Sequence, residues 1–240
     1  MSGSVADNID RQSGVIAEPA GGPEVRSDDP SASAGTVWFN TTSGVLKVYR
    51  LVAAWSSGGN STQGRYQVRG CGTLTAGLNF GGESSGRQAT SEEYDGSAWT
   101  AGNSLATARL GIGRAGTMTS ALGSGGNTTG NVNNTEEYDG TNWAAGGNLN
   151  TAIHTSRSNG IQTAAISTGG DLSSGITATC EIYDGTCWAA GTSFSAARYG
   201  HGAGGTSTSS FITAGHTGSA ILNSTEEFAE TVTARTVTDS

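Results

Sequence analysis

Glutamates at a fixed spacing are the residues of this sequence that most suggest chemistry. A glutamate stands two positions before an aromatic residue four times, at intervals of 44 or 45 residues. The four are Glu92, Glu136, Glu181 and Glu226. Carboxylate oxygens in equivalent places could form a ring that binds a cation. They could instead be structural partners of backbone amides or of the recurring Arg65, Arg109 and Arg198. We favour the structural role, because a catalytic carboxylate pair is not expected once in every repeat.

The other residue types that carry chemistry are scattered. The histidines are His154, His201 and His216. None of them has an acidic or nucleophilic partner at an informative spacing. Cys71, Cys180 and Cys187 match no zinc-binding pattern, and a bridge between Cys180 and Cys187 stays open as an alternative to three free thiols. We therefore predict that the protein is not an enzyme and has no metal site and no cofactor.

The elements that position these residues repeat with the same period. Each full copy has a glycine pair, then Glu-x-Tyr-Asp-Gly, then a tryptophan five positions after the tyrosine. The aromatic residues of the repeat are Tyr94, Trp99, Tyr138, Trp143, Tyr183, Trp188 and Phe228. A period of this size marks a repeat architecture, in which each unit buries its apolar face against its neighbours. One large aromatic residue per unit more often packs between sheets than stacks on a sugar.

One copy of the repeat predicts short strands. Residues 117–122 alternate small polar and apolar side chains and predict a strand that runs into the pair Gly125 and Gly126. Residues 135–138 predict a second strand, residues 139–140 a turn, and Trp143 the start of a return strand. No segment has a sustained apolar period of 3.6 residues, so helix should be nearly absent. We therefore predict an all-β fold.

The order of these features resembles the kelch repeat. A glycine pair, a glutamate before Tyr-Asp, a tryptophan and then an arginine follow one another as in that family, from Trp55 to Phe228. The run Arg198-Tyr199-Gly200-His201 is also similar to the family's Arg-x-Gly-His start. The resemblance implies a β-propeller of about four short blades, which residues 56–240 would form.

The first part of the chain differs from the repeats. Residues 1–36 are rich in Gly, Ser, Ala, Asp and Pro and have no apolar periodicity, which predicts an extended arm that a partner holds in place. Residues 37–55 predict a β-hairpin that leads into the first blade and could complete it. The apolar residues of this hairpin are Trp38, Phe39, Leu46, Val48 and Tyr49.

The arm and hairpin resemble a block found in tail and fibre proteins of tailed double-stranded DNA phages, and the repeats are similar to those of marine phage virion proteins. The resemblance implies a non-enzymatic virion component, associated with the tail or a fibre and assembled in the host cytoplasm. Residues 1–55 would dock to other virion proteins, in a symmetric homo-oligomer. A host-surface glycan or protein is a candidate ligand, contacted by aromatic residues outside the repeat pattern: Tyr66, Phe80 and Tyr199. A capsid decoration or head-fibre protein and a carbohydrate-active enzyme are the alternatives.

Composition limits the partners. The formal net charge is −8, and lysines and arginines form no cluster in the sequence, which disfavours nucleic acid. No apolar run approaches 18 residues, so no membrane span is expected. With 39 glycines and 34% hydrophobic residues, the core should be lean.

Overall fold

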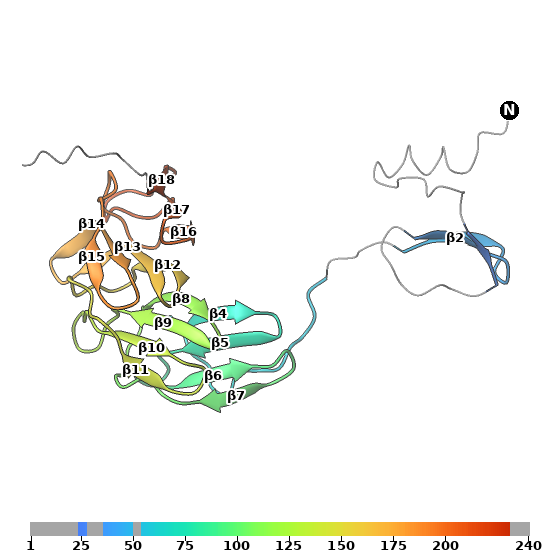
Figure 1. The fold of residues 1–240 in the computed structure, drawn as a ribbon, viewed down its shortest axis with the longest axis horizontal. Helices are drawn as coiled ribbons and strands as arrows, with labels where there is room; N and C mark the ends of the chain where they lie inside the picture. The colour runs from blue at the N-terminus through green and yellow to red at the C-terminus, as the bar shows by residue number, and fades with distance from the viewer. Residues whose placement is uncertain (1–23, 28–35, 50–53, 231–240) are drawn as a thin grey trace, which may run out of the picture. The chain divides into compact units, whose positions relative to one another are not determined.

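The computed structural model describes residues 24–27, 36–49 and 54–230. It contains strands and no helix in these residues, so the all-β prediction is confirmed. The chain divides into two compact units, Met1–Ser57 and Gly58–Ser240 (Figure 1). Most of the predicted arm lies outside the described residues.

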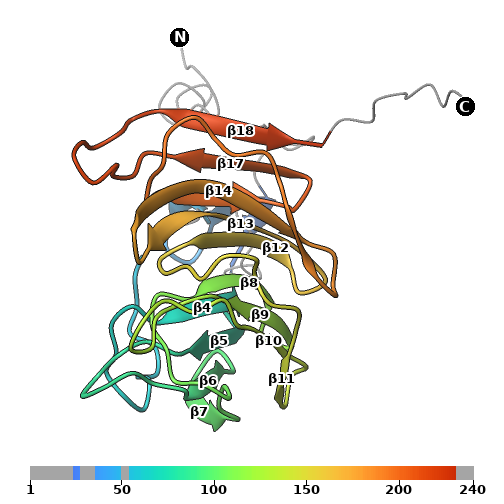
Figure 2. The same ribbon diagram turned by 90° about the vertical axis from the view of Figure 1, so that its left-hand side faces the viewer.

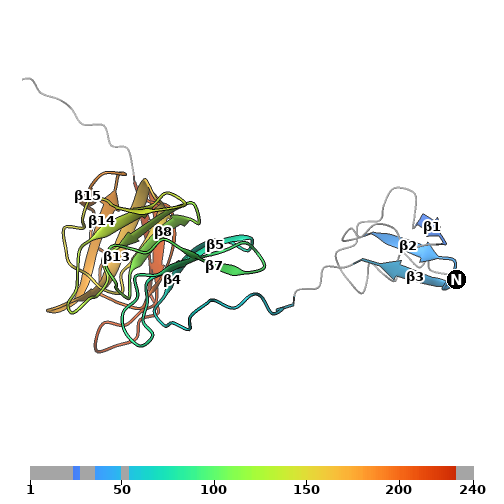
Figure 3. The same cartoon turned by 90° about the horizontal axis from the view of Figure 1, so that it is seen from below.

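The N-terminal unit contains a three-stranded sheet (Figure 3). Strand β1 (Glu24–Arg26) runs parallel to β2 (Val37–Asn40), which pairs antiparallel with β3 (Val45–Val48). The predicted hairpin is thus present, and its turn is closed by Asn40 Oδ1, which accepts hydrogen bonds from the Ser43 amide and hydroxyl. The strand partner of β2 outside the hairpin is β1, so the hairpin builds a sheet of its own and adds no strand to a described repeat sheet.

The second unit consists of four small antiparallel sheets, one for each repeat. The first contains β4 (Arg69–Thr73), β5 (Ala76–Phe80), β6 (Ser91–Tyr94) and β7 (Trp99–Gly102). The second contains β8 (Gly113–Thr117), β9 (Ser120–Ser124), β10 (Thr135–Tyr138) and β11 (Trp143–Ala145). The third contains β12 (Arg157–Ile161), β13 (Ala164–Leu172), β14 (Gly175–Tyr183) and β15 (Trp188–Ala190). The fourth contains β16 (Gly202–Gly205), β17 (Ser209–Thr213) and β18 (Thr225–Ala229).

One predicted strand was wrong. Residues 117–122 contain the turn between β8 and β9, because β8 ends at Thr117 and β9 begins at Ser120. Two strands of period two joined by a two-residue turn keep the same alternation of polar and apolar residues, so the sequence pattern hides the turn. The second and return strands of the repeat lie where predicted, as β10 and β11.

The glycine pair has the backbone role expected of it. Gly125 and Gly126 have φ angles of +62° and +108°, and a Cβ atom added to Gly126 would lie 2.9 Å from the Leu110 carbonyl oxygen. The Gly126 amide donates to the Ile153 carbonyl at 2.7 Å, at the start of the third repeat. The pair therefore joins one repeat to the next through a close backbone approach.

The four sheets stack in chain order, with the first and the fourth at opposite ends of the stack (Figure 2). Their first strands, β4, β8, β12 and β16, lie next to one another in the same order. The residues that the structure describes form an open stack of blade-like sheets and no closed ring.

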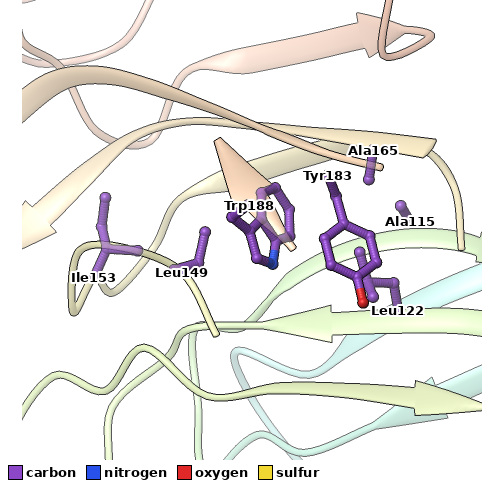
Figure 4. Packing of buried hydrophobic residues seen from close by; sticks show 7 residues of the cluster. All are labelled: Ala115, Leu122, Leu149, Ile153, Ala165, Tyr183 and Trp188. Carbon is purple, nitrogen blue, oxygen red and sulfur yellow. The ribbon is translucent and has the colours of Figure 1, made fainter. Parts of the chain in front are cut away.

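The core lies between the sheets. One cluster fills the junction of the first and second sheets and comprises Leu78, Phe80, Leu105, Ile112, Ala121 and Tyr138. A second fills the junction of the second and third sheets (Figure 4) and comprises Ala115, Leu122, Leu149, Ile153, Ala165, Tyr183 and Trp188. Each sheet therefore buries its apolar side chains against its neighbours, as a repeat of this period requires.

Candidate functional site

The repeated glutamates form buried ion pairs with the repeated arginines. Arg109 Nη2 lies 2.8 Å from Glu136 Oε1, and the two side chains are 0% and 5% exposed. Arg109 Nη1 also donates to the carbonyls of Gly125 and Asn134, at 2.8 and 2.7 Å. The corresponding pairs are Arg65 with Glu92 at 3.1 Å and Arg198 with Glu226 at 2.6 Å. These contacts support the structural role.

The third repeat lacks the arginine, and its glutamate is held by amides. Ile153 stands in the arginine position. Glu181 Oε2 accepts hydrogen bonds from the Asn150 backbone and side-chain amides at 2.7 and 2.8 Å, and Oε1 accepts from the Thr151 amide at 3.2 Å. The glutamate oxygens are therefore occupied, and the described residues contain no group of three or more His, Cys, Asp or Glu side chains that could hold a metal ion.

The repeated aromatic residues pack between sheets. Tyr183 and Trp188 have ring centroids 4.9 Å apart, and Trp188 Nε1 donates to Thr135 Oγ1 of the preceding sheet at 3.0 Å. Trp143 packs on Phe80 of the preceding sheet, with centroids 4.8 Å apart. Because Phe80 has 0% exposure, the prediction that it contacts a ligand is wrong.

Two other predicted ligand contacts lie nearer the surface and stay predictions. Tyr66 is 57% exposed and donates from Oη to Glu83 Oε2 at 2.9 Å. The Tyr199 ring is half-buried and lies 5.4 Å from the His216 ring.

The histidines have separate structural surroundings. His201 is buried, its Nε2 lies 3.1 Å from Thr168 Oγ1, and burial together with Arg157 and Arg198 lowers its pKa to about 4. It is therefore neutral at pH 7. His154 Nε2 lies 3.3 Å from Gln67 Oε1, in another part of the unit.

The cysteines are all free. Cys180 is buried and Cys187 is exposed, so the alternative of a bridge between them is wrong. Burial raises the pKa of the Cys71 and Cys180 thiols to about 11, which leaves them protonated and poorly nucleophilic at pH 7.

A pocket lined by three arginines is the feature that sequence reasoning missed. Arg69 on β4, Arg114 on β8 and Arg157 on β12 border a pocket of about 510 Å³. The other lining residues are Ile112, Ser156, Ser158, Asn159, Gly200, His201, Gly202 and Ala203. No carboxylate is among the described residues that line it. We refer to it as the arginine pocket.

The arginines of this pocket repel one another. Burial, together with the charges of Arg157 and Arg114, lowers the pKa of Arg69 to about 10. Burial and Arg114 also lower the pKa of Arg157. An anion in the pocket would relieve the repulsion between these guanidinium groups. The signal in the sequence was the spacing of 45 and 43 residues, close to the repeat period.

The N-terminal sheet exposes apolar side chains. Val25, Phe39 and Leu46 are cross-strand neighbours, and Val25 and Phe39 are 67% and 37% exposed. Val48 is 45% exposed, whereas Trp38 is 2% exposed and lies 4.7 Å from the Tyr49 ring. An exposed apolar row of this kind is typical of a surface that binds another protein.

No family model matches the chain, and no curated protein matches it. In the described part of the chain, no helix is long and apolar enough to cross a membrane.

Proposed function

We propose that this chain is a non-enzymatic structural component of a phage particle, associated with the tail or a fibre. Its N-terminal unit docks to other virion proteins, and its repeat unit binds acidic groups on the host surface. The arginine pocket is the observation that carries the binding role. The resemblance of the arm, hairpin and repeats to phage virion proteins is what suggests the particle.

The regular residues of the repeat are used in packing, so a ligand would have to bind elsewhere on the repeat unit. The glutamates of the repeat contact arginines or amides, and the tyrosines and tryptophans of the second and third repeats pack against the preceding sheet, as described above. In the arginine pocket, Arg69 and Arg157 each donate one bond to a backbone carbonyl, those of Ile112 and His201. The pocket gathers these two arginines and Arg114 without an acidic partner among its described lining residues. In a chain of net charge −8, such a local cluster favours a specific anionic ligand over general attraction to polyanions.

The chemistry of the pocket indicates carboxylate, sulfate or phosphate groups. Guanidinium groups bind these oxyanions through paired hydrogen bonds. The side chain of Asn159, which also borders the pocket, carries an amide group suited to sugar hydroxyls. An acidic polysaccharide of the host envelope combines both kinds of group.

The binding role is tested with Arg114→Gln in the full-length chain. Arg114 is exposed, so its replacement should leave the fold intact. We expect affinity for an acidic host polysaccharide, measured by calorimetry, to fall about tenfold, and to fall further as salt rises. Arg87→Gln is the matched control, because Arg87 is also exposed and lies outside the pocket. Equal affinities for the two variants would contradict the assignment.

The docking role is tested separately by deleting residues 1–36. We expect the shortened protein to keep its β circular dichroism and to be absent from purified particles. Normal incorporation of the shortened protein would contradict docking through the arm. The alternative role is that of a capsid decoration or head-fibre protein. Imaging of particles would decide between that position and one on the tail or a tail fibre.

A further inference from the structure

The first sheet of the repeat unit leaves uncovered the face that the second and third sheets bury. Tyr94 and Trp99 on this face are half-buried, and Leu74 is 84% exposed. Their counterparts in the second repeat, Tyr138, Trp143 and Met118, pack against the first sheet. The uncovered face is hollowed along Gly70, Gly72, Gly77, Tyr94 and Trp99. We call it the leading face.

The fourth sheet leaves uncovered the face that, in the first and second sheets, packs against the next sheet. Phe211 is 44% exposed and stands in the position of Leu78 and Leu122, which are 1% and 0% exposed. The equivalence follows from strand register, because Leu78 pairs with Glu93, Leu122 with Glu137 and Phe211 with Glu227. Glu227 is exposed. We call this the trailing face.

Inner junctions show how a leading face binds a trailing face. The Tyr138 hydroxyl donates to Glu93 Oε1, from the second sheet to the first. The Tyr183 hydroxyl donates to Glu137 Oε1 at 2.5 Å, from the third sheet to the second. A tyrosine of each leading face is thus matched to a glutamate of the trailing face before it.

The junction between the third and fourth sheets, which we call the third junction, lacks both the tyrosine and the glutamate. Ile182 replaces the glutamate on the third sheet, and Phe228 replaces the tyrosine on the fourth. The two residues change together, as expected if an unpaired buried carboxylate or hydroxyl is costly. One tyrosine and one glutamate of this series are then left over, Tyr94 and Glu227. Neither side chain has a hydrogen-bond partner among the residues that the structure describes.

We propose that a second copy of this chain binds head to tail, its leading face on the trailing face of the first copy. The Tyr94 hydroxyl of one copy donates to the Glu227 carboxylate of the other. Phe211 enters the hollow beside Gly77. This contact is independent of the proposed anionic ligand.

The sizes of the facing residues fit this contact. Gly77 lies beside Tyr94 and Trp99, where the inner leading faces carry Ala121 and Ala165. A smaller residue on the leading face thus meets a larger one, Phe211, on the trailing face. This exchange keeps the packed volume of the junction nearly constant, as a close-packed interface requires.

The backbone around the Tyr94 hydroxyl already resembles that of an inner junction. A Cβ atom added to Gly58 would lie 2.9 Å from Tyr94 Oη, as one added to Gly146 would lie 2.9 Å from Tyr183 Oη. The leading face of the first sheet is therefore shaped like an inner one. Because the first and fourth sheets lie at opposite ends of the stack (Figure 2), the partner face comes from another copy. Contact between unlike faces builds a ring if the rotation closes, and a fibre if it does not.

The association is tested on the full-length chain by sedimentation velocity over a range of concentrations. We expect the wild type to associate. Tyr94→Phe and Glu227→Gln should each raise the dissociation constant about tenfold. Glu230→Gln is the matched control, because Glu230 is exposed just beyond β18, and it should behave as the wild type.

A rescue variant separates this contact from general effects on packing. Tyr94→Phe with Glu227→Ile copies the Phe228 and Ile182 pair of the third junction, and should restore association to within a few-fold of the wild type. A wild type that stays monomeric would overturn the proposal. Association that neither single substitution weakens, or losses that simply add in the double variant, would overturn it as well.

Discussion

Tyr183 on β14 donates a hydrogen bond of 2.5 Å to Glu137 Oε1 on β10, which joins the third sheet to the second. Removing the hydroxyl in Tyr183→Phe leaves Glu137 without this donor in a half-buried position. We expect the free energy of unfolding to fall by about 1–3 kcal/mol, measured by urea denaturation. Tyr66→Phe is the control, because its bond to Glu83 is exposed and its loss should change stability little. Equal losses in the two variants would show that the junction bond adds nothing.

The same tyrosine predicts a loss of stability at high pH. Burial and the Glu137 bond raise the pKa of Tyr183 from 10.0 to about 12. The folded state therefore keeps the phenol proton at a pH where the unfolded chain loses it. This contribution is complete below pH 10 and disappears as the pH rises through about 12. Urea denaturation across this range should show stability falling with pH, and less steeply in Tyr183→Phe. Parallel curves for the two proteins would contradict the assignment.

The Arg109 and Glu136 pair predicts a larger loss. In Arg109→Met the Glu136 carboxylate stays buried without its cation, and the carbonyls of Gly125 and Asn134 lose a donor. We expect a loss of about 3–5 kcal/mol in the free energy of unfolding. Arg87→Met is the control, because Arg87 and its hydrogen bonds to Asn127 are exposed and their loss should cost much less. A loss below that of Tyr183→Phe would contradict a central role for the ion pair.

The glycine pair gives a prediction about the backbone. In Gly126→Ala the new Cβ would lie 2.9 Å from the Leu110 carbonyl oxygen, at a φ of +108°. We expect destabilisation of about 1–3 kcal/mol, seen as a lower midpoint of thermal unfolding. Gly130→Ala is the matched control, because nothing lies within 4 Å of a Cβ at that position. A control as damaging as Gly126→Ala would mean that the loss comes from the loop itself.

Sequence alone determined the period and the all-β content, and it favoured a structural role for the repeated glutamates. Strand alternation, Asp-Gly turns and glycine pairs act through the local backbone, so their consequences could be predicted without knowing how the sheets pack. The coincident recurrence of Arg109 and Glu136 with their counterparts indicated a contact inside a repeat, and the structure contains it in the first, second and fourth repeats. The turn at Met118 was missed because alternation continues through it.

Only the tertiary structure decided what lies between the repeats. Sheet stacking buries Phe80 under Trp143, gathers Arg69, Arg114 and Arg157 at one pocket, and sets Tyr183 against Glu137. These contacts depend on which face of each sheet meets the next, and residues about 44 positions apart carry no local sign of that choice. Side-chain packing across the junctions fixes it, because each sheet is too small to bury its own apolar face.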